Sequence, residues 1–142
     1  MDDRQDIEDL VQRLAACLDE KRFEGMRSLF TADATARTPG GAVEGRDALI
    51  AQATRNHAPD RATQHLIGGV LVEQAGHTAT VRANVLVTFA DPADGRPQLV
   101  MGEVYRLSAR RTGEGWRLTS VETAPTWRVE GSPAPVAAGR AR

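Results

Sequence analysis

The sequence predicts an α+β domain in which three helices come first and a long antiparallel sheet follows. Apolar residues recur at helical spacing before residue 60, and from Arg61 onward the pattern changes to that of β-strands. Short connections with glycine join the strand-like runs, as is typical of hairpins. We therefore expect a bent sheet wrapped over the helices, forming a cone whose apolar interior can hold a ligand.

Each of the three helices has its own signal. The first is predicted over residues 3–20, where one apolar stripe at three- and four-residue spacing is formed by Ile7, Leu10, Val11, Leu14 and Leu18. A second, short helix fits "RFEGMRSLF", residues 22–30. A third fits "RDALIAQATRNH", residues 46–57, which Gly45 can cap and Pro59 ends.

Four runs rich in β-branched residues follow, over residues 61–73, 78–90, 97–110 and 115–129. Their succession predicts an antiparallel meander. A strand of ~12 residues must bend to keep its apolar face on a small core. Gly68 and Gly69, in the middle of the first run, are the expected place of that bend.

Composition and charge narrow the function classes. The chain has 142 residues, of which 41% are hydrophobic and 26% charged, and this suits one globular domain. Its net charge of -1 and its scattered arginines argue against binding to nucleic acid or to an acidic membrane. We expect the domain over residues 1–130. The remainder, 131–142, contains proline and lacks aromatics, which predicts a disordered tail.

The sequence also predicts the cellular location of the protein and whether its site holds a cofactor. The acidic, amphipathic N-terminus lacks the basic start and apolar run of a secretory signal, and no run approaches the ~20 apolar residues of a bilayer span. A cytoplasmic protein is therefore predicted. Cys17 is the only cysteine, so no internal disulfide can form. Metal-ligand spacings, phosphate loops and dinucleotide fingerprints are missing from the sequence, which predicts a site with no metal and no cofactor.

His65 and Asp19 are the candidate catalytic residues. His65 stands near the start of the first strand and shares a face with Ile67, while Asp19 lies four residues after Ala15 at the edge of the helical stripe. Both side chains can therefore point into an apolar interior, where a carboxylate fixes the tautomer of an imidazole base. Two other interpretations stay open: a structural histidine, and a solvated Asp19 that pairs with Lys21 or Arg22.

Five segments occur in a characteristic order: "CLDE", "MRSLFTADA", "VEGRDALI", "TQHLIGG" and "GWRLTSVETAPTW". This succession resembles the SnoaL-like branch of the NTF2-like superfamily, and the last two segments are similar to those of scytalone dehydratase. The resemblance extends from residue 4 to about residue 129. It implies the NTF2-like cone, with a sheet that is mixed parallel and antiparallel at its edge. It also implies a homodimer or homotrimer joined through the exposed sheet face.

The resemblance gives the two candidate residues their roles. In scytalone dehydratase and a related dehydrochlorinase, a strand histidine pairs with an aspartate at the end of the first helix, and His65 and Asp19 match them. His65 is thus implied to remove a proton next to a carbonyl or leaving group, oriented by Asp19. Leu18 and "DATART" stand where scytalone dehydratase has the two tyrosines that hold water on the substrate carbonyl. This departure argues against the native substrate of that enzyme.

The candidate substrate-binding residues are Asn84, Tyr105, Trp127, Leu18 and Phe30. The face of the strand residues among them depends on where bulges fall. The second pocket histidine of scytalone dehydratase falls near Thr88 or Phe89, and neither is basic. His57, in the loop "NHAPD", is expected to be exposed, with closure of the pocket mouth as the lesser alternative.

We therefore predict a cofactor-independent lyase or isomerase, most specifically a dehydratase, that acts on a small apolar cyclic or polyketide-type molecule. His65 would abstract a proton and Asp19 would orient it. One alternative is an aldol-type polyketide cyclase in which an aspartate is the main acid–base group. Another, of a different class, is a non-catalytic small-molecule-binding or dimerisation domain.

Overall fold

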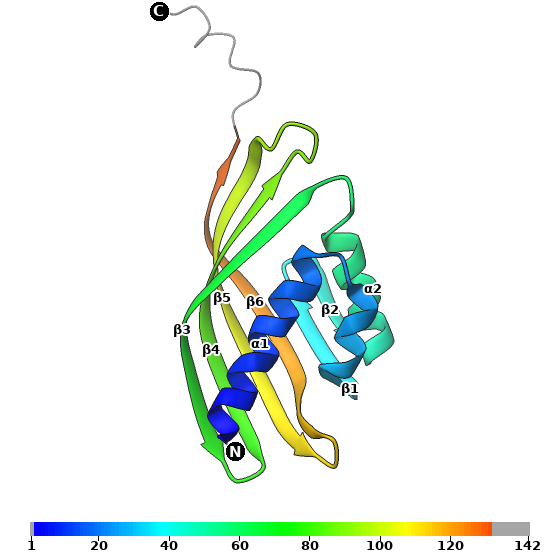
Figure 1. Cartoon of the computed structure of the whole chain (residues 1–142), viewed down its shortest axis with the longest axis vertical. Helices are drawn as coiled ribbons and strands as arrows, with labels where there is room; N and C mark the ends of the chain where they lie inside the picture. Colours follow the sequence, from blue (N-terminus) through cyan, green and yellow to red (C-terminus); the bar gives the residue numbers. More distant parts are fainter. Residues whose placement is uncertain (1, 132–142) are drawn as a thin grey trace, which may run out of the picture.

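The computed structural model describes residues 2–131, shown in Figure 1. Its helical elements are α1 (Asp3–Asp19), the 3-10 helix η1 (Phe23–Ser28) and α2 (Arg46–Asn56). Its strands are β1 (Phe30–Thr38), β2 (Gly41–Glu44), β3 (Ala62–Ala75), β4 (Thr78–Ala90), β5 (Pro97–Thr112) and β6 (Gly115–Glu130). The tail predicted over 131–142 lies, except for Gly131, outside the described residues, and the domain limits stay a prediction.

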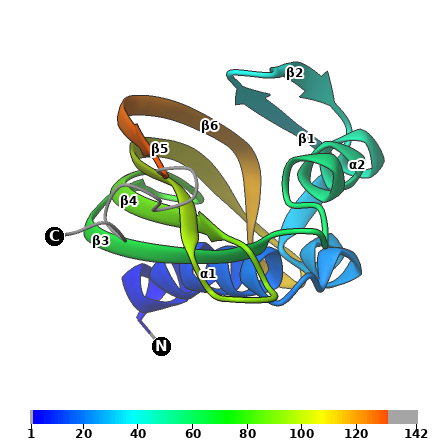
Figure 2. The same ribbon diagram turned by 90° about the horizontal axis from the view of Figure 1, so that it is seen from above.

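The strands form one sheet in the order β2-β1-β6-β5-β4-β3. Neighbours pair antiparallel except β1 and β6, which run parallel, so the sheet is mixed near one edge. Helix α1 lies across one face of the sheet, and β1 and β2 turn away from the other strands beside α2 (Figure 2). The predicted α+β cone with three N-terminal helical segments is confirmed.

The sequence pattern missed β1 and β2. Strand β1 has the sequence "FTADATART", whose inward positions carry small residues such as Ala34 and Ala36 in place of β-branched ones. Asp33 lies within the strand, where the Thr31 hydroxyl donates to its carboxylate at 2.7 Å. The parallel pairing with β6 connects segments more than eighty residues apart, and local periodicity carries no information about such a contact.

Helix α1 supplies much of the core. Its predicted stripe is buried against the sheet, with Ile7 and Val11 fully inaccessible to solvent. Burying each such side chain contributes roughly 1.5–3 kcal/mol. The start of the helix is also fixed, because Arg111 on β5 donates two hydrogen bonds to the Asp3 carboxylate, at 3.1 and 2.6 Å. None of the helices in the described residues has the length and apolar character needed to cross a membrane.

The expected bend in β3 is present. Its register against β4 shifts between Gly68 and Leu71, and Gly69 adopts a left-handed backbone with φ of 58°. A β-carbon at Gly69 would lie 2.9 Å from Nδ2 of Asn84, whereas one at Gly68 would meet nothing within 4 Å. The bend therefore depends on one glycine of the pair.

Replacement of Gly69 by alanine is expected to destabilise the fold by about 1–2 kcal/mol, because a side chain is strained in the left-handed region and must also displace Asn84. The matched change Gly68→Ala should alter the free energy of unfolding by less than about 0.5 kcal/mol. Urea denaturation of both variants measures the difference. Equal stabilities would show that the bend does not need the positive φ of Gly69.

Candidate functional site

The side chains of Asp19 and His65 meet at the junction of α1 and β3. The ring Nδ1–H of His65 donates to Oδ1 of Asp19 at 2.6 Å, and the backbone N–H of His65 donates to Oδ2 at 2.8 Å. The His65 side chain is only 1% exposed and that of Asp19 is 21% exposed. Within the described part of the chain, Nε2 of His65 makes no hydrogen bond. With Nδ1 bound to Asp19, Nε2 is the ring nitrogen left to accept a proton from a substrate.

Neither expected cation pairs with Asp19. Lys21 has a positive φ of 59° and reaches away, donating to the carbonyl of His57 at 2.9 Å and to the Thr63 hydroxyl at 3.0 Å. Arg22 donates to Glu20 instead, at 2.9 Å. The interpretation of Asp19 as a solvated carboxylate paired with Lys21 or Arg22 is therefore wrong. Lys21 instead links the end of α2 to β3, directly beside the dyad.

A cavity of about 310 Å³ is lined in part by His65. Its apolar wall comes from β4, β5 and β6, through Val87, Phe89, Leu99, Met101 and Pro125. Its polar groups include His57, Glu103, Tyr105, Thr123 and Arg128. A smaller cavity of about 60 Å³ shares His57 and Tyr105 with it and reaches Leu18 and Phe30. The structure thus brings His65, Tyr105, Leu18 and Phe30 to one connected set of cavities.

His57 is a second histidine of this site, and the prediction that it is exposed is wrong. Its ring centroid lies 5.5 Å from that of His65 and 6.1 Å from that of Phe89. Burial lowers the pKa of His57 from 6.5 to about 4, although its Nδ1–H donates to the carbonyl of Ala53 at 2.9 Å. The ring is therefore neutral at pH 7. Its Nε2 can accept a hydrogen bond from a bound molecule.

Glu103 is a site residue that the sequence pattern missed. It lies on the inner face of β5, two residues before Tyr105, and is 9% exposed. Burial raises the pKa of Glu103, while charge on His65 lowers it. Burial also raises the pKa of Tyr105 above its ordinary value. The available signal was the alternation of "MGEVYRL", in which Glu103 and Tyr105 share a face with Leu107.

Asn84 and Trp127 lie on the opposite, outer face of the sheet, which corrects their predicted place in the pocket. Asn84 alternates with the inward residues Ala83 and Val85 and accepts a hydrogen bond from Arg82. For Trp127 the cause is a bulge. Gly102 pairs with Trp127 whereas Glu103 pairs with Pro125, so the extra residue at position 126 reverses the alternation. Arg128 consequently lines the cavity in place of Trp127.

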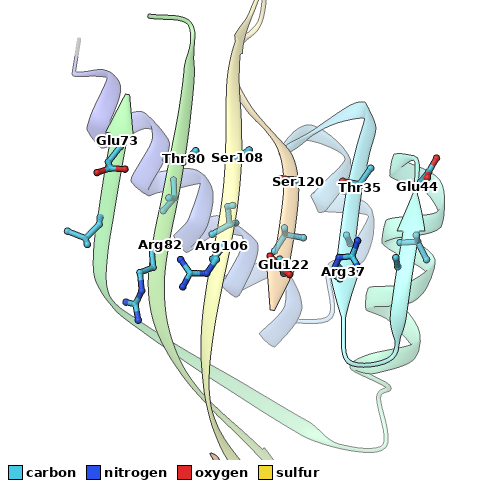
Figure 3. Close-up of a pocket in the computed structure, with 17 residues that line it drawn as sticks. Thr35, Arg37, Glu44, Glu73, Thr80, Arg82, Arg106, Ser108, Ser120 and Glu122 are labelled. Carbon is cyan, nitrogen blue, oxygen red and sulfur yellow. The ribbon is translucent and has the colours of Figure 1, made fainter. Parts of the chain in front are cut away.

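A larger hollow of about 650 Å³ lies on this outer face (Figure 3). Strand register places one row of hydroxyl groups across it, from Thr35, Ser120, Ser108 and Thr80, with Glu44 and Glu73 at the two ends. A second row contains Arg37, Glu122, Arg106 and Arg82. The charged side chains of the hollow are mostly exposed and its lining contains no histidine, so it lacks a base of the kind that His65 provides. We therefore assign the chemistry to the smaller inner cavity.

The side chains of the site are of the kind used in acid–base chemistry. Within residues 2–131, no group of three or more His, Cys, Asp or Glu side chains is placed to hold a metal ion. The groups around His65 are those of acid–base chemistry: one paired imidazole, one neutral imidazole and one buried carboxyl. Such a set can remove a proton and donate another.

Comparison with known proteins gives a family match and several similar structures. Residues 1–122 match the sequence model of a family described as the SnoaL-like domain. No curated protein matches the chain. The Kfla4162 protein of Kribbella flavida superposes with a TM-score of 0.80 at 27% identity, over 89% of this chain and 93% of that one.

Two further similar structures come from Novosphingobium species. A candidate scytalone dehydratase of Novosphingobium aromaticivorans has a TM-score of 0.76 at 22% identity, over 96% of this chain and 93% of that one. The hexachlorocyclohexane dehydrochlorinase LinA-type3 of Novosphingobium barchaimii has a TM-score of 0.78 at 15% identity, over 89% and 88%. At these identities the two structures show a shared fold.

The free energy of unfolding should decrease as the pH is lowered, because His57 is buried in its neutral form. In the unfolded chain the pKa of His57 returns to its ordinary value of 6.5, whereas it is about 4 in the fold. Between these pH values the unfolded chain binds a proton at His57 that the folded chain does not. The contribution of His57 to the free energy of unfolding is therefore complete above pH 6.5 and is lost as the pH falls toward 4. The loss should reach about 3 kcal/mol.

Urea unfolding at neutral pH and near pH 4 measures this loss. The variant His57→Gln should lack that component of the pH dependence, and His77→Gln, in the exposed turn between β3 and β4, should retain it. If both variants depend on pH as the unaltered protein does, His57 is not the group responsible.

Proposed function

Because the chain belongs to the SnoaL-like domain family, we propose that it is a lyase of the dehydratase type. It removes a proton from carbon in a small, largely apolar cyclic or polyketide-type molecule and expels an adjacent leaving group. His65 is the base and Asp19 orients it. Both side chains come from the chain itself.

One observation carries this proposal: Asp19 holds both the ring and the backbone amide of His65, at 2.6 and 2.8 Å, beside a cavity of about 310 Å³. The carboxylate fixes the Nδ1–H tautomer, leaves Nε2 as the basic atom and stabilises the imidazolium that forms. A base positioned in this way contributes ~10²–10⁴ in rate when it lies within hydrogen-bond reach of the substrate proton.

The cavity supports the substrate class. Its volume of about 310 Å³ suits a small molecule of one or two rings, and its walls are largely apolar. Two proteins of the same fold carry names of eliminating enzymes, a dehydratase that expels water and a dehydrochlorinase that expels chloride with a proton. Both reactions begin with loss of a proton from carbon, which is the step assigned to His65.

The geometry favours elimination over the two alternatives. An aldol-type cyclase needs an aspartate as the main acid–base group, but both oxygens of Asp19 already accept hydrogen bonds from His65. A purely structural dyad would be packed by neighbouring side chains, whereas His65 lines a cavity. A cytoplasmic location, expected from the sequence, stays a prediction.

The first test uses β-hydroxytetralone, a bicyclic β-hydroxy ketone that becomes naphthol when it loses water. Asp19→Asn should lower kcat about 10²–10⁴-fold, because the amide no longer selects the Nδ1–H tautomer of His65. His65→Gln should lose turnover as fully. The rise of naphthol absorbance measures the rate, and circular dichroism checks that each variant folds.

His77→Gln is the matched control, since this histidine is exposed in a turn away from the cavity. It should keep the rate of the unaltered protein. Glutamine is chosen at position 65 because the ring is 1% exposed, and the smaller alanine would leave a cavity beside Asp19. Undiminished turnover by His65→Gln would remove this histidine from the chemistry.

We further propose that two copies of the chain associate through the outer sheet face as a homodimer. This face exposes Leu66 at 68%, Leu86 at 39% and Trp127 at 49%, and register places them in one row across β3, β4, β5 and β6. The neighbouring hollow carries Glu44 and Glu73 at its two ends, and a row with three arginines and Glu122 between them. A twofold axis can therefore bring arginines of one copy against glutamates of the other.

The double variant Leu66→Glu, Leu86→Glu should shift the protein from dimer to monomer, because it places four like charges in the contact. Ala75→Glu adds a similar charge at the exposed end of β3, outside the row, and should leave the dimer intact. Sedimentation velocity measures both. A monomer or a trimer of the unaltered chain would contradict the face-to-face contact.

A further inference from the structure

Glu103 is a buried acid that the base dyad does not use. Within residues 2–131, the buried polar side chains are Thr31, Gln52, Thr63 and Glu103, and only the last is a carboxylic acid. Its carboxyl receives no hydrogen bond from the described residues. Burial of a carboxyl that lacks both a donor and a paired cation favours its neutral form.

Register places Glu103 on the same sheet face as the base, with strand β4 between them. His65 pairs with Val87 on β4, and the next inward row contains Ile67, Val85 and Glu103. His65 and Glu103 therefore occupy adjacent rows of one sheet face, two strands apart, and both line the cavity of about 310 Å³. Because both residues line this cavity, a molecule bound in it can contact His65 and Glu103 together.

The other ionisable groups around this cavity do not neutralise Glu103. Arg128 pairs with Glu130 at 3.2 Å, and the Arg61 guanidinium lies 4.4 Å over the Phe89 ring. His57 is uncharged at pH 7. Asp19 is held by His65. Among these groups, His65 is therefore the one whose charge acts on Glu103 and changes during the reaction.

We propose that Glu103 is the general acid of this site and that the leaving group it protonates is an oxygen. This inference rests on the proposed function and narrows its substrate class to β-hydroxy carbonyl compounds. A neutral carboxylic acid can donate a proton to a departing hydroxyl, which is a poor leaving group as hydroxide.

The step balances with these two residues. Nε2 of His65 takes the proton from the carbon next to the carbonyl, and the electron pair of that C–H bond becomes the carbon–carbon double bond. The neighbouring C–O bond breaks, and its oxygen takes the Glu103 proton and leaves as water. The site then holds an imidazolium and a carboxylate, and transfer of one proton from His65 to Glu103 restores it.

Electrostatics couples the two proton transfers. Before the reaction, burial raises the pKa of Glu103, which favours retention of its proton. When His65 becomes charged, the imidazolium lowers that pKa, so removal of the substrate proton promotes delivery of the acid proton. Tyr105 is a poorer acid, because burial and the nearby carboxyl raise its pKa well above its ordinary range.

Two probes with different leaving groups test the proposal. β-Hydroxytetralone needs a proton on its departing oxygen, whereas β-chlorotetralone expels chloride, which needs none. Glu103→Gln should slow naphthol formation from the hydroxy compound ~10²–10⁴-fold and from the chloro compound by less than about 5-fold. His65→Gln should slow both, and Glu114→Gln, in the exposed turn between β5 and β6, should slow neither.

Equal loss on both probes would reduce Glu103 to a structural residue, and no loss on the hydroxy compound would remove it from the reaction; either result overturns the proposal. A readout that needs no turnover separates this from failure of the proposed function. Carboxyl carbon NMR of glutamate-labelled protein should show Glu103, assigned by its absence in Glu103→Gln, titrating at higher pH than the exposed Glu24 and Glu114. If the unaltered protein converts neither probe, the proposed function fails for β-substituted ketones. If Glu103 instead titrates together with the exposed glutamates, its role as general acid is overturned, whatever the activity results.

Discussion

The site depends on the two hydrogen bonds that Asp19 accepts from His65. One comes from the backbone amide and one from the ring of the same residue, at 2.8 and 2.6 Å. The bond to the amide fixes where β3 starts relative to the end of α1, and the bond to the ring fixes the orientation of the imidazole. Hydrogen bonds to a charged acceptor are about twice as strong as neutral ones. Helix placement and ring orientation therefore cannot change independently.

The remaining architecture keeps that contact in a dry place. Arg111 holds the other end of α1 through Asp3, and the helical stripe between the two ends is buried. The bend at Gly69 turns β3 toward the helix, and the sheet then separates an inner face from an outer one. The inner face carries His65 and Glu103 beside the cavity, whereas the outer face carries solvated charges and an exposed apolar row.

Much of this was accessible from the sequence, and the failures have physical causes. The stripe of α1, the four long strands and the glycine bend follow from local periodicity, and Asp19 and His65 were identified on those elements and on the resemblance. Strand β1 was missed because small alanines fill its inner positions and its partner β6 is distant in sequence. Trp127 was placed on the wrong face because one bulged residue reverses alternation, and a bulge has no local signature here. The buried state of Glu103 and His57 comes from packing between strands and helix that no single segment encodes.

Lys21, the only lysine in the chain, determines how the protein responds to chemical labelling through amines. Its ammonium joins the His57 carbonyl to the Thr63 hydroxyl, and burial lowers its pKa. Amine-directed reagents therefore have one side-chain target besides the α-amino group, and that target adjoins the dyad. Coupling this protein to a surface or a dye through amines would detach the end of α2 from β3, so attachment through an introduced exposed cysteine is the gentler chemistry.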